Sequence, residues 1–185
     1  MPLHTLKDLL IELTRDLYNA ESQYRAILPS LVTSATDEEL HKELEQISEQ
    51  VGANISWLEH AATHLDITPG GVTCEAMRGL IRDTRDTLVK YGDPHVIDAA
   101  LIANAQRIAH YEIAGYGTAR QFAKVLGEDR LADIFADLAR AASNVDQRLS
   151  KVANGGWFAR GVNQRAETPA AATPVAPMRD VVLER

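Results

Sequence analysis

The sequence is poor in cysteine, in positive charge and in long apolar runs, which disulfide-rich, nucleic-acid-binding and membrane-spanning proteins respectively require. Cys74 is the single cysteine in 185 residues, which excludes an internal disulfide framework and fits a reducing compartment. Basic residues are outnumbered 19 to 26, and the net charge of −7 argues against nucleic acid or an anionic membrane as a partner. No apolar run approaches the ~18 residues of a membrane span, and the N-terminus lacks a basic-then-apolar signal pattern. We therefore expect a cytoplasmic protein.

Aromatic residues are also scarce, at 5% of the chain, and no segment shows the alternation of apolar and polar residues that is typical of a strand. Helical periodicity is present instead, in five segments that span about residues 5–33, 36–65, 74–90, 94–126 and 129–153. Four of these are long, on the order of 40–50 Å each at 1.5 Å rise per residue. The sequence therefore predicts an all-α protein.

Local signals mark the ends of the predicted helices. Thr36 and Glu39 have the spacing of a capping box at the start of the second helix. Asp93 followed by Pro94 favours a helix start at that point. Pro29 lies inside the first segment and is expected to bend or loosen it, because proline lacks a backbone donor.

The lengths of the connections predict the topology. Short loops join the first helix to the second and the fourth to the fifth, so each pair forms an antiparallel hairpin. The residues between about 66 and 93 join the two hairpins and contain the short third helix. This is the pattern of a ferritin-like four-helix bundle with a long crossover that carries a short extra helix. We expect residues 1–156 to form this bundle.

Residues 157–185 have a different composition and form a Pro/Ala-rich C-terminal tail, expected to be extended or docked. Trp157 and Phe158 are expected to pack back on the end of the bundle. The last segment, residues 178–185, offers Val181, Val182 and Leu183 to a possible protein partner. A tail without a role is the simpler interpretation.

Two carboxylates interrupt the apolar faces of the helices. Spacing by three and four residues gives one row in the fourth helix and one in the first: Leu101, Ala105, Ile108, Glu112, Gly115, Ala119, Phe122 and Leu126, and Leu13, Leu17, Glu21, Tyr24 and Leu28. Glu21 and Glu112 therefore point inward near the middle of their helices. Burying an ionised carboxylate costs several kcal/mol unless a cation, a hydrogen-bonding partner or a shared proton compensates.

A metal site is one possible compensation. Di-iron and di-manganese bundles use a Glu from each of two helices and a Glu-x-x-His from each of the other two. Here the inner face of the second helix offers Gln50 and Asn54 as polar neighbours, and no Glu-x-x-His occurs. Ala141 and Ala142 stand where the fifth helix would need ligands. Glu21 and Glu112 are thus candidate ligands of an incomplete site. We expect no cofactor, with iron or manganese as the alternative.

Three stretches point to a known family: "DLLIELTRDLYNAESQYRAILPSLV", "CEAMRGLI" and "AHYEIAGYGTARQFAKVLG". They resemble the YciE/YciF family of ferritin-like stress-response proteins, and the resemblance covers about residues 5–153. It implies a five-helix ferritin-like fold, a homodimer and induction under stress, without a clear biochemical activity. The glutamates of the family pattern are matched by Glu21 and Glu112. The sequence departs from the pattern at Ile47, Gln50, Ala109, Ala141 and Ala142.

Two hypotheses of function follow, and a third concerns the tail. The first is a metal-free structural or partner-binding dimer, in which Gln50, Asn54, Tyr18 or Tyr111 accompanies the carboxylate pair. The second is a di-metal oxidoreductase that handles iron or peroxide. The third is a cargo or adaptor protein that docks through its C-terminal peptide. The missing ligands favour the first hypothesis, and with it a protein that is not an enzyme.

The remaining reactive side chains have simpler explanations. His60 and His64 share a helix face, but no third zinc ligand is evident and solvated histidines are expected. His110 lies about 200° around the helix from Glu112 and is expected at the surface. Cys74 is expected to be a buried small apolar residue near a helix start.

Overall fold

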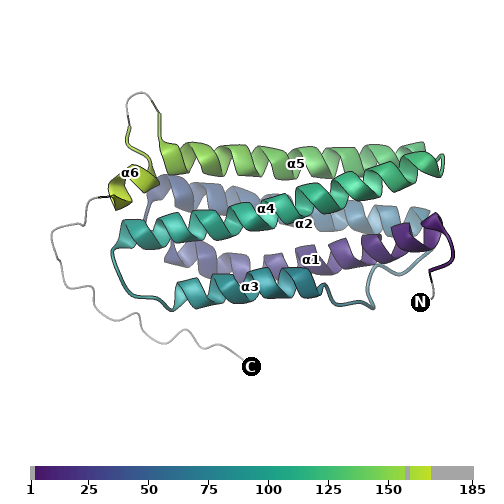
Figure 1. Cartoon of the computed structure of the whole chain (residues 1–185), viewed down its shortest axis with the longest axis horizontal. Coiled ribbons are helices and arrows are strands. Elements are labelled where there is room, and N and C mark those ends of the chain that lie inside the picture. The colour runs from purple at the N-terminus through teal and green to yellow at the C-terminus, as the bar shows by residue number, and fades with distance from the viewer. Residues whose placement is uncertain (1–2, 157–158, 168–185) are drawn as a thin grey trace.

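The computed structural model describes residues 3–156 and 159–167. This part of the chain contains six helices and no strand (Figure 1). The helices are α1 (Leu6–Ser34), α2 (Glu38–His64), α3 (Glu75–Leu88), α4 (Pro94–Val125), α5 (Asp129–Asn154) and α6 (Val162–Ala166). The predicted all-α fold is confirmed.

The four long helices form the predicted bundle. α1 packs against α2 and α4 packs against α5, and contacts of α1 with α4 and of α2 with α5 close the bundle. The two hairpins are joined by a crossover that runs along the length of the bundle, and α3 lies within that crossover (Figure 1). α3 contacts α1 and α4. The predicted long crossover with a short extra helix is therefore confirmed.

The start of α2 differs from the prediction. The N-cap is Asp37, whose Oδ1 accepts hydrogen bonds from the backbone N–H groups of Glu39 and Leu40, whereas Thr36 was predicted to cap. The Thr36 hydroxyl instead donates to Asp98 of α4 at 2.7 Å. The predicted capping box was wrong because a carboxylate distant in sequence takes the Thr36 side chain.

Asp98 holds one end of the bundle together. Its buried carboxylate accepts hydrogen bonds from the N–H groups of Thr36 and Asp37, each at 2.9 Å, and from the Thr36 hydroxyl. Asp37 in turn forms an ion pair with Arg165 of α6. The loop between α1 and α2 is thereby fixed to the start of α4 and to α6.

The helices pack closely because small residues lie at their contacts. At Gly115 of α4, a Cβ atom would come within 2.7 Å of Cδ2 of Leu17 on α1. Leu17 is itself buried, so a glycine is needed for this approach. Pro29 lies inside α1 without interrupting it.

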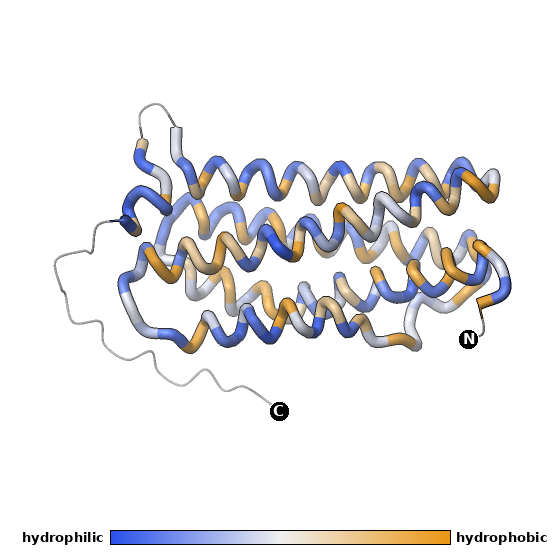
Figure 2. The backbone as a smooth tube through the Cα atoms, viewed as in Figure 1, coloured by the Kyte–Doolittle hydropathy of each residue, from blue (hydrophilic) through white to orange (hydrophobic). Residues whose placement is uncertain are grey.

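The interior consists of two apolar clusters. One contains Leu28, Leu31, Leu40, Leu44, Leu101, Ile102 and Leu149 among others, and lies toward the α1–α2 loop. The other contains Leu10, Leu17, Leu58, Ala119, Leu131 and Phe135 among others, and lies toward the α4–α5 loop. Apolar residues recur along every long helix in Figure 2. Between the clusters, at about mid-height of the bundle, lie buried polar side chains.

The chain after the bundle is described only in part. Residues 159–167 fall in the segment expected to be extended or docked, and there α6 packs on α4 and α5 with Val162 buried. The expected positions of Trp157 and Phe158 and the expected docking peptide, residues 178–185, lie outside the described residues. None of the described helices is both long and apolar enough to cross a membrane.

Candidate functional site: a buried pair of carboxyl groups

Glu21 and Glu112 both lie in the interior, as their places in the apolar rows predicted. The exposed fraction is 0% for Glu21 on α1 and 4% for Glu112 on α4. Burial raises the pKa of the Glu112 carboxyl, and the charge of Glu21 adds to this shift, so the two groups interact. Two antiparallel helices of adjacent hairpins thus bring two carboxyl groups to the same height.

Neutral donors form hydrogen bonds with one of the two carboxyl oxygens of Glu21. Its Oε1 accepts from Nδ2 of Asn54 at 2.9 Å and from the hydroxyl of Tyr116. Oδ1 of Asn54 in turn accepts from Nε2 of Gln50 at 2.9 Å. The structure therefore brings together all four residues named from the sequence, Glu21, Glu112, Gln50 and Asn54, although Gln50 reaches the pair only through Asn54.

The tyrosines of the site are different from those expected. Tyr18 donates to Glu59 at 3.4 Å, and Tyr111 donates to Asp16 at 2.5 Å, so neither hydroxyl bonds to the carboxyl pair. Tyr116, one helical turn after Glu112, takes that place. The spacing of four residues places Tyr116 and Glu112 on one face of α4, and this signal was available in the sequence.

Three oxygen atoms of the site have no hydrogen-bond partner among the described residues. They are Oε2 of Glu21, Oε1 of Glu112 and the hydroxyl of Tyr24. A buried carboxylate without donors is costly, so the neutral form of the group is favoured. The site is polar, but it has too few hydrogen-bond donors to stabilise two ionised carboxylates at once.

Burial decides the protonation of the pair. Desolvation raises the pKa of Glu21 from 4.5 to about 7, although the hydrogen bonds from Tyr116 and Asn54 oppose this shift. Desolvation also raises the pKa of Glu112 well above its usual value, and the charge of Glu21 adds to that effect. Glu112 has no such donors, so it is the carboxyl group that keeps its proton at neutral pH.

The residues around the pair do not fit a di-metal centre. Ile47 on α2 and Ala142 on α5, which stand where the family resemblance implies ligands, are apolar and 1% exposed. Among the described residues no three His, Cys, Asp or Glu side chains gather in a way that could hold a metal ion. Two carboxyl groups, two amides and two phenols would provide weak ligands for iron or manganese.

The other buried glutamate, Glu43, is not available as a ligand either. Its Oε1 and Oε2 accept hydrogen bonds from Nε of Arg148 on α5, at 2.8 and 3.1 Å. Burial raises the pKa of Glu43, and the bond and charge of Arg148 oppose this. The pair joins α2 to α5 as a structural contact.

The histidines considered from the sequence are dispersed at the surface. His60 is exposed and its ring meets that of Trp57 edge to face, with the centroids 5.5 Å apart. His64 lies 3.0 Å from Glu128 at the start of α5. His110 is exposed and lies 3.4 Å from Asp146.

Cys74 is buried, as predicted, and is the N-cap residue of α3. Its Sγ lies 2.9 Å from the hydroxyl of Tyr111, which donates to Asp16. Burial raises the pKa of the thiol. The thiol is thus protonated and shielded at neutral pH, and its contacts hold the crossover against α1 and α4.

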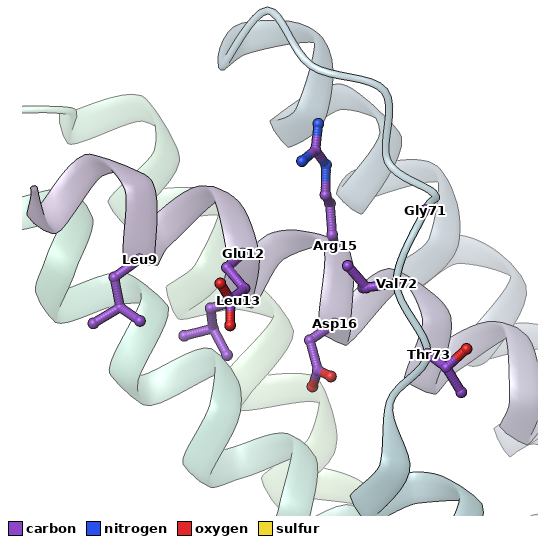
Figure 3. Close-up of a pocket in the computed structure, with 8 residues that line it drawn as sticks. All are labelled: Leu9, Glu12, Leu13, Arg15, Asp16, Gly71, Val72 and Thr73. Atoms are coloured by element: carbon purple, nitrogen blue, oxygen red, sulfur yellow. The ribbon is translucent and has the colours of Figure 1, made fainter. Parts of the chain in front are cut away.

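Two grooves on the surface do not open onto the carboxyl pair. One, of about 540 Å³, lies between α1 and residues 71–73, and its lining consists of Leu9, Glu12, Leu13, Arg15, Asp16, Gly71, Val72 and Thr73 (Figure 3). Nε of Arg15 donates to the carbonyl oxygen of Thr68 at 3.1 Å. The other groove, of about 600 Å³, lies between α1 and α3. The residues that line them do not include Glu21, Glu112 or Tyr116, so neither gives a substrate access to the pair.

Comparison with known proteins gives consistent results. The protein YciF of Escherichia coli (strain K12) is 32% identical over 174 residues, which make up 92% of this chain and 100% of YciF. The crystal structure of the E. coli stress protein YciF matches with a TM-score of 0.78 and 29% identity, over 80% of this chain and 94% of that chain. YcfI of Rhodopseudomonas palustris, described as a candidate structural protein, matches with a TM-score of 0.78 and 35% identity, over 81% of this chain and 96% of that chain.

These likenesses extend over the whole helical body rather than one motif. The sequence pattern of the family described as a domain of unknown function, DUF892, matches residues 5–167, which include all six helices. The expected relationship to YciF is confirmed. The chain belongs to the DUF892 family and is similar to E. coli YciF over most of its length.

Proposed function

We propose that this protein is a metal-free helical bundle that acts in the response to stress as a structural or partner-binding dimer. The similarity to the E. coli stress protein YciF and to YcfI, a candidate structural protein, supports this role. The buried, unpaired Cys74 supports a reducing compartment, and we place the protein in the cytoplasm.

One observation carries the proposal. At the height where a di-metal bundle needs carboxylate and imidazole ligands from all four helices, α2 contributes Asn54 and Gln50, and α5 contributes the buried Ala142. Asn54 and Tyr116 donate hydrogen bonds to the carboxyl oxygen of Glu21 that a cation would otherwise take. The centre is thus built to stabilise carboxyl groups by neutral donors.

A di-metal oxidoreductase is the second candidate. Oε2 of Glu21 and Oε1 of Glu112 have no donor among the described residues, and both are oxygen atoms that iron or manganese could accept as ligands. A single cation held by these two groups would leave most of its coordination shell to water. Because Glu21 and Glu112 are 0% and 4% exposed, such water would have to be buried together with the ion.

Elemental analysis of the full chain, purified without chelators, tests the proposal. We expect well under one iron or manganese per two chains after incubation with either ion and desalting. Glu112→Ala and, as a matched control, exposed Glu12→Ala are treated in the same way. Near-stoichiometric metal that is retained in Glu12→Ala and lost in Glu112→Ala would refute the metal-free proposal and establish the second candidate.

A further inference from the structure

The groove between α1 and α3 gathers positive charge on a chain whose net charge is −7. Its volume is about 600 Å³, and α3 packs beside α1 (Figure 1). Three arginines of α3 line one wall: Arg78, Arg82 and Arg85. Gln23 and Ala26 of α1 form the other wall, and Glu75 is the only carboxylate among the described residues of the lining. The groove is therefore a local basic surface on an acidic protein.

Two of these arginines have no partner within the described part of the chain. Arg78 forms an ion pair with Glu75 at the start of α3. Arg82 and Arg85 are exposed and form neither a hydrogen bond nor an ion pair with a described residue. Like charges three or four residues apart on a helix repel each other and destabilise it. An anion held between these side chains would remove that repulsion, so the arrangement favours a negatively charged ligand.

The wall formed by α1 does not neutralise these charges. Residues 22–34 of α1 contain no aspartate or glutamate, and Arg25 is the one charged residue among them. Asp83 and Asp86 are exposed on α3, but neither of them lines the groove. The positive charge therefore persists along the arginine wall, which is about 10 Å long from the first arginine to the third at 1.5 Å rise per residue.

From these observations we infer that the groove binds a short chain of condensed phosphate groups. A guanidinium group presents a planar fork of N–H donors that matches the oxygen atoms of a phosphate. A single phosphate can engage one or two of the arginines, whereas several linked phosphates can contact all three of them. The site lies apart from the buried carboxyl pair, so the inference goes beyond the proposed function and depends on neither the absence of metal nor the dimer.

The lining also indicates which part of a phosphate compound is bound. Proteins that hold nucleobases commonly provide aromatic side chains on which the base stacks. Among the described residues of the lining none is aromatic, and the apolar side chains are those of Ala26 and Ile81. A nucleobase would therefore gain little from this surface. We expect the phosphate chain itself to carry the binding.

Calorimetric titration of the full chain, at physiological ionic strength and without divalent cations, tests the class of ligand. We expect tripolyphosphate to bind at one site per chain and orthophosphate to bind roughly 10-fold more weakly, since it reaches fewer arginines. ATP should bind no more tightly than tripolyphosphate. Absence of tripolyphosphate binding would overturn the inference, as would equal affinity for a short polyglutamate peptide, which carries carboxylates instead. Tighter binding of ATP would show that the base contributes and would overturn it as well.

Matched substitutions test the position of the site. Arg85→Gln is expected to weaken tripolyphosphate binding roughly 10-fold, whereas Arg130→Gln, at an exposed position of α5, should leave it unchanged. Ala26→Glu brings a carboxylate into the opposite wall and keeps all three arginines, so it should weaken binding similarly. Ala114→Glu, at an exposed position of α4, is its control for net charge. Circular dichroism checks that the variants keep their helices. Equal affinities of each variant and its control would show that the phosphate chain binds elsewhere and would refute this site.

Discussion

Replacing Glu21 with glutamine should remove the part of the pH dependence of stability that the ionisation of Glu21 produces. Glutamine has nearly the same shape and keeps an oxygen that can accept from Asn54 and Tyr116, but it does not ionise. The substitution therefore separates the cost of a buried charge from the packing of the site. Glu12→Gln, at an exposed position of the same helix, is the matched control.

The magnitude follows from the pKa of Glu21, which burial raises from 4.5 to about 7. The folded protein therefore binds a proton more tightly than the unfolded chain between these pH values. The stability that this proton provides is complete below pH 4.5 and is lost as the pH rises through 7. A shift of this size corresponds to about 3 kcal/mol of unfolding free energy. Glu112, whose pKa is raised further, extends the loss to higher pH.

Urea denaturation followed by circular dichroism, at pH 5, 6, 7 and 8 and one protein concentration, measures these free energies. We expect Glu21→Gln to match the wild type within about 1 kcal/mol at pH 5 and to exceed it by about 3 kcal/mol at pH 8. Glu12→Gln should follow the wild-type curve. A wild-type stability that stays constant or rises between pH 5 and 8 would refute the buried-charge argument, as would an unchanged slope in Glu21→Gln.

Three further predictions concern packing, hydrogen bonding and burial. Gly115→Ala should destabilise the protein by about 1–3 kcal/mol in urea denaturation, because the new Cβ would clash with Leu17. Gly117→Ala, where a Cβ would meet no other atom, should be neutral or stabilising. Equal effects of the two substitutions would contradict the close contact between Gly115 and Leu17. Asp98→Ala should lower the melting temperature and cost about 2–4 kcal/mol, since the donors of three hydrogen bonds lose their acceptor; an unchanged melting temperature would contradict this role. The thiol of Cys74 should react with a thiol reagent only after unfolding in urea, and fast native labelling would show that it is accessible.

Features that depend on nearby residues were predictable from the sequence. The start of α4 was located at Pro94 because Asp93 and Pro94 are adjacent and form a local cap, in which Oδ1 of Asp93 accepts from the N–H of His95. The inward orientation of Glu21 and Glu112 followed from helical periodicity alone, and the structure shows both to be buried.

Features that depend on distant residues were not predictable in the same way. The cap of α2 was assigned to Thr36, but Asp98 on another helix takes the Thr36 hydroxyl and leaves capping to Asp37. No local pattern contains this contact. Tyr111 was considered for the carboxyl pair, yet it bonds to Asp16 from the side of α4, while Tyr116 lies on the inner face. The spacing of four residues between Glu112 and Tyr116 indicated the correct tyrosine, and the choice of Tyr111 was wrong.

The polar layer between the two apolar clusters also sets how the helices are aligned lengthwise. Apart from the contact of Leu17 with Gly115, apolar side chains of similar size specify this alignment loosely, because they can repack against one another at small cost. A shift of one turn, about 5.4 Å, between α1 and α4 would separate Glu21 from the Tyr116 hydroxyl. The Glu21 carboxyl would then be buried among apolar side chains without this donor. The hydrogen bond between Tyr116 and Glu21 thus favours one lengthwise alignment of α1 and α4 over the alternatives.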